Sequence, residues 1–261
     1  MHPHSTLPVL LVTGGGRGIG AATARLAAQR GYAVAVNYAH NAGAAEQLVA
    51  EIQAQGGQAM ALQADIADEA QVLRLFATVD AQLGPLYGLV NNAGVVDAPS
   101  RVEHMDLARL QRMFNINVIG SFLCAREAVR RMGTSQGERN FGAGYGRGGA
   151  IVNVSSAAAR LGSPGQYVDY AAAKGAIDSM TLGLAREVAA DGIRVNAVRP
   201  GLIETAIHAS GGLPDRVRDL ASSVPMQRGG TADEVAQAIL WLLSPEASYT
   251  TAALVDVSGG R

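Results

Sequence analysis

The sequence predicts an α/β fold: a doubly wound parallel sheet of about seven strands with helices on both faces. Short apolar runs alternate along the chain with helical stretches of about ten or more residues, the order expected of parallel βαβ units. The runs are apolar throughout, as in strands that are buried on both faces. A length of 261 residues, 48% of them hydrophobic, suits one domain with a large core.

The predicted strands are short runs rich in Val, Ile, Leu and Ala, and most of them end beside Gly, Asn, Ser or Pro. In chain order they are Val9–Thr13, Ala33–Asn37, Ala59–Gln63, Leu86–Asn91, Ala150–Ser155, Arg194–Arg199 and Leu254–Val257. The predicted helices have helical composition, and Gly or Pro follows each within a few residues. They are Ala21–Arg30, Ala44–Gln55, Glu69–Leu83, Asp106–Met132, Tyr167–Ala190 and Thr231–Leu243.

Residues 1–261 are expected to form a single domain, because no linker or repeated block interrupts the alternation. Residues 1–8 are predicted to be a short N-terminal tail. Gly133–Gly149 is rich in glycine and is predicted to be a surface loop without a chemical role. Residues 201–223 follow the sixth strand. Ligands of such sheets bind beyond the carboxyl ends of the strands, so this segment is a predicted substrate lid.

Charge and composition exclude several classes of function. Of the 21 basic residues only Lys174 is a lysine, and 22 acidic residues bring the formal net charge to −1. Ala173 and Gly175 flank this lysine, so the chain has no Walker A loop. Without a basic excess we expect no nucleic-acid partner. No apolar run approaches the roughly 18 residues of a membrane span, so we expect no membrane partner.

Cysteine usage and the first residues indicate a cytoplasmic protein. Cys124 is the only cysteine and has no internal partner for a disulfide. No Cys and His residues have zinc-ligand spacing, so no metal site is expected. Residues 1–8 lack the basic and apolar regions of a secretion signal.

A glycine-rich turn joins the first predicted strand to the first helix and reads TGGGRGIG over residues 13–20. Glycines allow a sharp turn and the close approach of a ligand, and the following helix N-terminus attracts a pyrophosphate. The dinucleotide pattern of Rossmann-type sheets fits on Gly16, Gly18 and Ala21, or in a second frame on Thr13, Gly14, Gly18 and Gly20. Both frames predict the same phosphate site.

The end of the second strand favours NADP(H) over NAD(H). NAD sites place an acidic residue there to hold the ribose 2′-hydroxyl. Here Asn37 and Tyr38 are followed by Ala, His and Asn, and the first acidic residue of the chain is Glu46. Arg17, in the glycine turn, is available to a 2′-phosphate.

Tyr170 and Lys174 are four residues apart at the start of a predicted helix, so their side chains share a face. A nearby ammonium group lowers the pKa of a tyrosine toward neutrality, as an acid/base catalyst near pH 7 requires. Ser155 and Ser156 end the fifth strand, at the same sheet edge as the glycine turn. The spacing therefore predicts an acid/base site beside the predicted dinucleotide.

Together these motifs resemble the short-chain dehydrogenase/reductase family over nearly the whole chain. The resemblance rests on the glycine turn Thr13–Gly20, on Asn91–Gly94 (NNAG), on Ser156, on Tyr170-x3-Lys174 and on Pro200-Gly201, in this order. It implies that Tyr170 is the acid/base, that Lys174 lowers its pKa and holds the nicotinamide ribose, and that Ser156 orients the substrate. It also implies a proton relay supported by Asn117.

The resemblance also implies which residues contact the cofactor. Asp65 and Ile66 match the pair that contacts adenine, and an acidic helix cap is the alternative for Asp65. The full predicted set is Gly14, Gly16, Arg17, Gly18, Ile19, Gly20, Asn37, Tyr38, Asp65, Ile66, Asn91, Ala93, Gly94, Tyr170, Lys174, Pro200, Gly201, Ile203 and Thr205. Ser156 and Tyr170 are 14 residues apart, one more than in many members.

The expected reaction is hydride transfer between NADP(H) and a carbonyl or secondary alcohol. A 3-oxoacyl thioester on acyl carrier protein and a sugar or polyol are the competing substrates, and the sequence does not choose between them. A non-catalytic dinucleotide-sensing protein is the alternative of another class, but it has no use for Ser156, Tyr170 and Lys174 together. A serine hydrolase would need a G-x-S-x-G elbow, which the chain lacks. Family resemblance implies a homotetramer paired through the helices Asp106–Met132 and Tyr167–Ala190.

Overall fold

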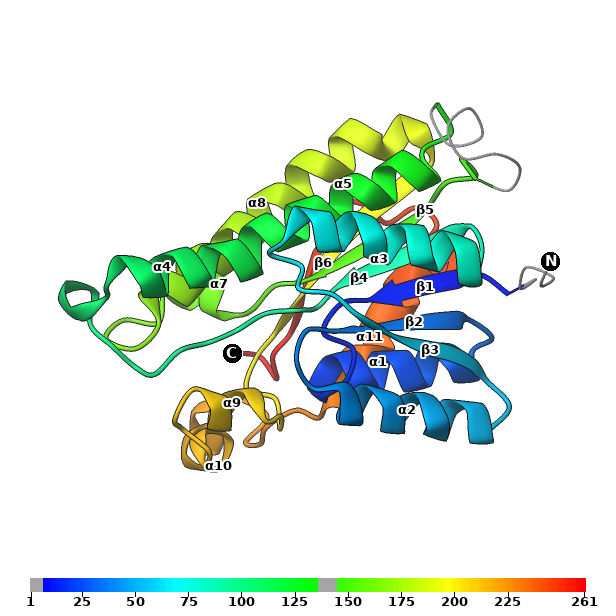
Figure 1. The fold of residues 1–261 in the computed structure, drawn as a ribbon. Helices are drawn as coiled ribbons and strands as arrows, with labels where there is room; N and C mark the ends of the chain where they lie inside the picture. The colour runs from blue at the N-terminus through cyan, green and yellow to red at the C-terminus, as the bar shows by residue number, and fades with distance from the viewer. Residues whose placement is uncertain (1–6, 136–144) are drawn as a thin grey trace.

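The computed structural model describes residues 7–135 and 145–261. Its strands form one parallel sheet in the order β3-β2-β1-β4-β5-β6-β7, which confirms the predicted doubly wound fold (Figure 1). The strands are β1 (Val9–Val12), β2 (Ala33–Tyr38), β3 (Gln58–Gln63), β4 (Leu86–Asn91), β5 (Gly149–Val154), β6 (Ile193–Pro200) and β7 (Leu254–Val257). Each lies within three residues of its predicted position.

Helices cover both faces of the sheet (Figure 1). On one face lie α1 (Gly18–Gln29), α2 (Ala42–Ala54) and α11 (Ala232–Leu243). On the other lie α3 (Glu69–Gln82), α4 (Leu107–Phe114), α5 (Gly120–Met132) and α8 (Val168–Val188). Short helices that the sequence did not predict are α7 (Ala158–Leu161), α9 (Ile207–Ser210) and α10 (Arg216–Leu220).

Two apolar cores form because successive residues of a strand point to opposite faces of the sheet. Leu10 and Val12 of β1 enter the core beneath α1, α2 and α11. Val9 and Leu11 enter the other core, beneath α3, α5 and α8. All four are essentially inaccessible to solvent. The double burial explains why β1 is apolar at every position.

The predicted helix Asp106–Met132 consists of α4 and α5 joined by a π-helical turn, Asn115–Ile119. Asp106 is the N-cap of α4, and its carboxylate accepts a hydrogen bond from the backbone N–H of Arg109 at 2.8 Å. A π-helical turn inserts an extra residue and is frequent at functional sites. Helical periodicity alone does not reveal such an insertion.

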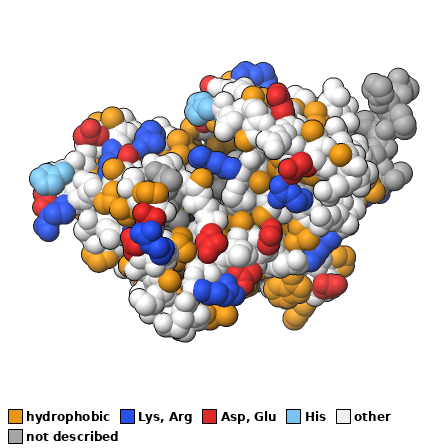
Figure 2. Space-filling model, turned by 90° about the horizontal axis from the view of Figure 1, so that it is seen from below, with side chains coloured by type: hydrophobic (Ala, Val, Ile, Leu, Met, Phe, Trp, Pro, Cys, Tyr) orange, Lys and Arg blue, Asp and Glu red, His pale blue; other side chains and the backbone are white. Residues whose placement is uncertain are grey.

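The 201–223 segment lies beyond the carboxyl end of β6, as predicted, and contains α9 and α10 (Figure 1). The described ends of Gly133–Gly149 lie at the opposite edge of the sheet, before β5, and residues 136–144 are outside the described structure. Among the described residues, no helix combines the length and apolar character needed to cross a membrane. On the face shown in Figure 2, positive and negative side chains are interspersed.

Candidate active site

A groove crosses the carboxyl ends of the strands where the strand order reverses, between β1 and β4. It consists of two cavities of about 460 and about 170 Å³. We call the larger the glycine-turn cavity and the smaller the tyrosine pocket. Both are lined by Ile19, Asn92, Gly94, Thr205 and Ile207, so they are continuous.

The glycine turn forms one wall of the glycine-turn cavity, through Gly14, Gly16, Arg17 and Gly18. Gly14 and Gly18 have φ angles of 59° and 54°, a region that favours glycine. A Cβ on Gly14 would lie 2.9 Å from the Cα of Ala93. The turn therefore needs glycine both for its conformation and for its contact with the loop after β4.

The N-terminus of α1 is suited to hold a phosphate group. Its N-cap, Arg17, has an extended backbone and no capping side chain, and the first turn contains no acidic residue. The first N–H groups of a helix lack partners within the helix and carry a partial positive charge. Because Gly18 and Ile19 line the cavity, this end of α1 fits the pyrophosphate of a dinucleotide.

The loop after β4 is held against the glycine turn by two residues outside the predicted set, Thr13 and Asn92. The Thr13 hydroxyl accepts hydrogen bonds from the backbone N–H groups of Asn92 and Ala93 at 3.0 and 3.1 Å. The Asn92 amide donates to the carbonyl oxygens of Thr13 and Gly14 at 2.9 and 3.0 Å. Both belong to motifs that the sequence displays, but spacing does not show which members bind one another.

Three residues predicted to contact the cofactor instead contact mainly other parts of the protein. Gly20 is buried under the turn, where a Cβ would lie 2.5 Å from the Asn92 amide nitrogen. Asn91 is buried and lines neither cavity, because its amide donates to Asn153 and to the carbonyl oxygen of Ser121. Asn37 lines the glycine-turn cavity, yet its amide binds the Gly14 N–H and the Ala64 carbonyl.

The far part of the glycine-turn cavity contains the other predicted residues. Tyr38, Asp65, Ile66 and Arg17 all line it, together with His40 and Asn41. Asp68 is the N-cap of α3, while the Asp65 carboxylate accepts from the backbone N–H of Ala67 at 2.9 Å. Among the described lining residues Asp65 is the only acid, and it follows β3 instead of β2.

Lys174 is buried between α8 and the end of β5, with 4% of its surface exposed. Its ammonium group donates to the carbonyl oxygen of Val154 at 2.7 Å and lies 5.6 Å from the centre of the Tyr170 ring. Burial lowers the pKa of Lys174 to about 8, and the nearby Asp178 carboxylate partly opposes this. A Cβ on Gly94 would meet the Asn117 side-chain oxygen at 2.7 Å and the Lys174 ammonium at 3.5 Å.

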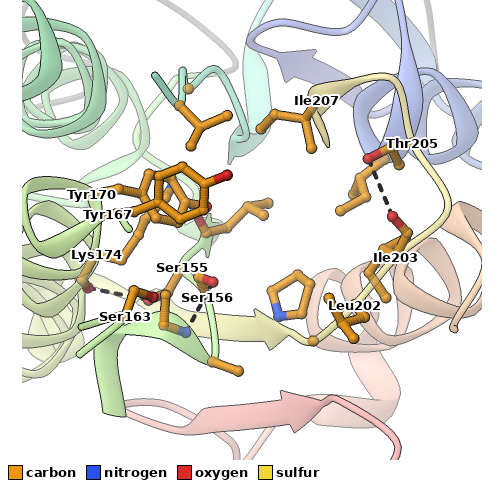
Figure 3. A pocket seen from close by; sticks show the side chains of 18 of the residues that line it. Ser155, Ser156, Ser163, Tyr167, Tyr170, Lys174, Leu202, Ile203, Thr205 and Ile207 are labelled. Atoms are coloured by element: carbon orange, nitrogen blue, oxygen red, sulfur yellow. Dashed lines mark hydrogen bonds between the residues drawn. The ribbon is translucent and has the colours of Figure 1, made fainter. Parts of the chain in front are cut away.

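Tyr170 and Ser156 both line the tyrosine pocket (Figure 3), and the Ser156 hydroxyl accepts a hydrogen bond from the backbone N–H of Ala158 at 3.1 Å. Burial raises the pKa of the Tyr170 hydroxyl, and the neighbouring Ser156 side chain partly lowers it. The sequence led us to expect a lowered pKa through Lys174. The structure differs because the Lys174 ammonium is directed to the Val154 carbonyl and desolvation of the phenolate dominates.

Asn117 lies buried in the π-helical turn, and its side chain is held by the backbone of Val95. Its oxygen accepts from the Val95 N–H at 2.9 Å, and its nitrogen donates to the Val95 carbonyl at 3.0 Å. The side chain therefore positions the loop after β4 beside Lys174. A part for Asn117 in a proton relay stays a prediction.

The segment after β6 closes the tyrosine pocket on the side facing Tyr170. Its lining there includes four of the residues predicted to contact the cofactor, Pro200, Gly201, Ile203 and Thr205, together with Leu202 and Ile207 (Figure 3). Further lining residues that the sequence did not assign are Val96, Ser155, Leu161, Ser163, Arg216 and Arg261. Their separation along the chain leaves no local motif by which to find them.

The first turn of α8, which carries Tyr170, is fixed by a buried ion pair. Arg109 of α4 donates to the Asp169 carboxylate at 2.8 Å, and the exposed fractions of the two side chains are 12% and 0%. Arg109 also donates to the carbonyl oxygen of Ala98 at 2.7 Å. The pair joins α4, α8 and the loop after β4 around the pocket.

The described residues contain no group of three or more His, Cys, Asp or Glu side chains arranged to hold a metal ion. The site instead combines a phosphate-binding turn with a Ser, Tyr and Lys cluster in one groove. These features define a dinucleotide-dependent oxidoreductase that acts on carbonyl or CH–OH groups.

Comparison with known proteins agrees with this class. A family model described as enoyl-(acyl carrier protein) reductase matches residues 14–261. The uncharacterized oxidoreductase YgfF of Escherichia coli (strain K12) is 56% identical over 255 residues, covering 98% of this chain and 100% of the relative. A 3-oxoacyl-[acyl-carrier-protein] reductase of Synechocystis is 37% identical over 256 residues, covering 98% of this chain and 97% of the relative.

Among solved structures, a blue fluorescent protein from a metagenomic library, in complex with NADPH, has a TM-score of 0.85 and 35% identity. The match covers 97% of each chain. The chain belongs to the short-chain dehydrogenase/reductase family, as its motifs indicated.

Proposed function

We propose that this oxidoreductase reduces a carbonyl, or oxidises the matching secondary alcohol, with NADP(H), and that Tyr170 is its acid/base. The observation that supports this most directly is the gathering of Ser156, Tyr170 and the buried Lys174 in one pocket, with the Lys174 ammonium 5.6 Å from the centre of the Tyr170 ring. All three residues line a pocket continuous with the glycine-turn cavity. A dinucleotide-sensing protein would have no need of this cluster.

When bound, the nicotinamide supplies or accepts the hydride. The glycine turn and the N-terminus of α1 would hold its pyrophosphate, and Lys174 the ribose beside the nicotinamide. In reduction, Tyr170 donates a proton to the substrate oxygen while Ser156 donates a hydrogen bond to the same oxygen. The Lys174 ammonium, 5.6 Å from the centre of the Tyr170 ring, is the proposed counter-charge for the phenolate that remains, against the desolvation that raises the Tyr170 pKa in the free protein.

NADP(H) is proposed over NAD(H) because no acidic residue directly follows β2 and because Arg17, in the glycine turn, is available. Arg17 has no carboxylate partner among the described residues. A residue after β2 that could bind a ribose hydroxyl, Asn41, instead caps α2. The first turn of α2 contains no acidic residue that would repel a phosphate. Arg17 is therefore available to pair with a 2′-phosphate, while Asp65, the one acid among the described lining residues, follows β3 instead of β2.

The proposed substrate is a 3-oxoacyl thioester, as in the Synechocystis relative, with a sugar or polyol as the alternative. The walls of the tyrosine pocket include Val96, Leu161, Leu202 and Ile207. An acyl chain gains free energy when it covers such walls, whereas a polyol has little apolar surface to bury there. The pocket therefore favours the thioester.

The test is an NADPH-oxidation assay with acetoacetyl thioesters, simple ketones and aldoses, repeated with NADH. We expect turnover of thioesters or ketones with NADPH and much weaker turnover with NADH. Turnover of aldoses alone would replace the proposed substrate by a sugar. Binding of NADPH without turnover of any carbonyl compound would instead favour the sensing protein.

We further propose that the chain, as one domain over residues 1–261, works as a cytoplasmic homotetramer. Large apolar side chains of α4, α5 and the turn between them are exposed, namely Leu107 (68%), Phe114 (37%), Ile119 (48%) and Phe122 (51%). Such a patch marks a surface that another protein covers. Light scattering should give four subunits, and a monomer would contradict this assembly.

A further inference from the structure

The charged side chains of the residues that line the tyrosine pocket are all positive. They are Lys174, Arg216 and Arg261, and no acidic residue is among the described residues that line the pocket. The role of Lys174 in acid/base chemistry explains its presence. Neither arginine has a place in that chemistry.

Arginines elsewhere in the described chain commonly have a carboxylate partner. Near the pocket, Arg218 and Arg160 already bind the neighbouring carboxylates. In α10, Arg218 pairs with Asp215 and Asp219 at 3.0 and 2.9 Å. Near Arg261, Arg160 pairs with Asp256 at 3.4 Å. Arg216 and Arg261 form no ion pair with any residue that the structure describes. A guanidinium without a carboxylate at a cavity wall is a favourable site for an anion from solution.

Arg216 is held in place before any ligand binds. It donates to the side-chain oxygen of Gln166 at 2.7 Å, and its guanidinium lies 5.1 Å from the centre of the Tyr167 ring. A guanidinium has five N–H donors, so most of those of Arg216 remain available for a planar anion. Stacking on an aromatic ring reduces the conformational entropy that binding would otherwise cost.

Arg261 is anchored through its backbone. Its backbone oxygen accepts hydrogen bonds from Arg160 and from the Ser258 hydroxyl, each at 2.9 Å. These contacts hold the residue at the pocket wall, while its side chain forms no hydrogen bond or ion pair with any residue that the structure describes. The guanidinium is therefore available to the pocket.

Arg216 lies beside the helical turn that carries the reacting hydroxyl. Tyr167, on which Arg216 stacks, precedes Tyr170 by three residues at the start of α8. Both arginines and both tyrosines line the same pocket. One substrate could therefore place its carbonyl group at Tyr170 and Ser156 and its anionic group on Arg216.

We propose that Arg216 and Arg261 form an anion-binding subsite of the tyrosine pocket, so that the preferred substrate is a carbonyl compound with a carboxylate or phosphate group. This inference rests on the proposed function of the same pocket. The anion is either a carboxylate of a small oxo acid or the phosphate of a carrier arm on a thioester. The two sources share the chemistry that a guanidinium recognises.

The test compares matched substrates that differ only in charge. Levulinate and longer oxo acids are assayed against their methyl esters, and acetoacetyl-coenzyme A against the uncharged N-acetylcysteamine thioester. We expect kcat/KM to be about 10-fold or more higher for the charged member of at least one pair, as a charge-assisted hydrogen bond gives. Preference in the first pair identifies a carboxylate, and preference in the second a carrier phosphate. Equal rates in both pairs would overturn the subsite.

Variants of the arginines distinguish an effect of their charge from an effect of their packing. Arg216→Gln and Arg261→Gln should raise KM for the charged substrate about 10-fold, with kcat and the uncharged partner little changed. Arg216→Lys should restore part of the preference, because it keeps the positive charge. Arg218→Gln is the matched control, because Arg218 lies in the same helix but pairs with Asp215 and Asp219. A loss of preference in Arg218→Gln equal to that in Arg216→Gln would contradict the assignment.

A binding experiment distinguishes failure of the subsite from failure of the proposed reaction. Calorimetry with the wild-type enzyme and NADPH measures the affinity of cyclohexanecarboxylate, which cannot be reduced, against that of its amide. Tighter binding of the carboxylate, lost in Arg216→Gln, supports the subsite even if no carbonyl substrate is turned over. Equal binding of the two, with ketone turnover intact, leaves the reaction in place and overturns the subsite.

Discussion

The Lys174 ammonium group donates a hydrogen bond of 2.7 Å to the backbone carbonyl oxygen of Val154. Val154 is the last residue of β5, and Ser156 follows two residues later. The bond therefore ties the helix that carries Tyr170 to the strand that delivers Ser156. An arginine would place a larger, planar group in this buried position, which accounts for a lysine in a chain that otherwise uses arginine.

Replacing Tyr170 should abolish the reaction without loss of cofactor affinity. Tyr170→Phe removes the proton donor but keeps the ring, so we expect kcat to fall about 100-fold or more. NADPH affinity, measured by fluorescence titration, should change little. Tyr167→Phe is the control, because Tyr167 lines the same pocket but stacks on Arg216. A larger loss of kcat in Tyr167→Phe than in Tyr170→Phe would reverse the assignment.

Burial of Lys174 should make stability depend on pH above neutrality. Its pKa falls from 10.5 to about 8 on folding, so between these values the unfolded chain binds more protons and the free energy of unfolding rises with pH. Relative to Lys174→Met, wild type should gain at most about 3 kcal/mol across this window. Urea unfolding of both proteins at several pH values measures the difference. If the difference in the free energy of unfolding did not change with pH, folding would not lower the pKa of Lys174.

Removing Arg17 should weaken NADPH selectively. Arg17→Gln deletes the proposed partner of the 2′-phosphate, so we expect NADPH to bind about 10-fold more weakly. NADH affinity should stay within about twofold, because NADH lacks that phosphate. Arg30→Gln is the control, because Arg30 follows the other end of α1 and binds Gln237. If Arg17→Gln weakened both cofactors equally, Arg17 would not determine the preference.

Alanine at Gly14 should damage both stability and the phosphate site. The φ of 59° disfavours alanine by about 1–2 kcal/mol, and its Cβ would lie 2.9 Å from the Ala93 Cα. Gly31→Ala is a matched control, because Gly31 has a φ of 81° but open space around it. We expect Gly14→Ala to lower the urea midpoint further and to weaken NADPH about 10-fold or more. If Gly14→Ala and Gly31→Ala had the same effects on the urea midpoint and on NADPH affinity, the contact with Ala93 would not contribute.

Much of the fold could be predicted because its signals are local. The apolar runs and the glycine-terminated helices gave the strand positions within three residues, and Asp106 marked the start of α4. The π-helical turn at Asn117 was not predictable in this way. It is an insertion that neighbouring contacts with Val95 stabilise, and these contacts lie 22 residues away in the sequence.

The sequence by itself determined the glycine turn, the Tyr170–Lys174 pair and the sheet edge at which they meet, because each depends on short-range spacing and strand direction. Only the tertiary structure showed that Asn91 and Gly20 are buried among other protein groups. It also showed that Thr13 and Asn92 hold the glycine turn against the loop after β4. It also decided the direction of the Tyr170 pKa, because desolvation depends on everything packed around the hydroxyl. Arg216 and Arg261 line the pocket through segments that only folding brings together.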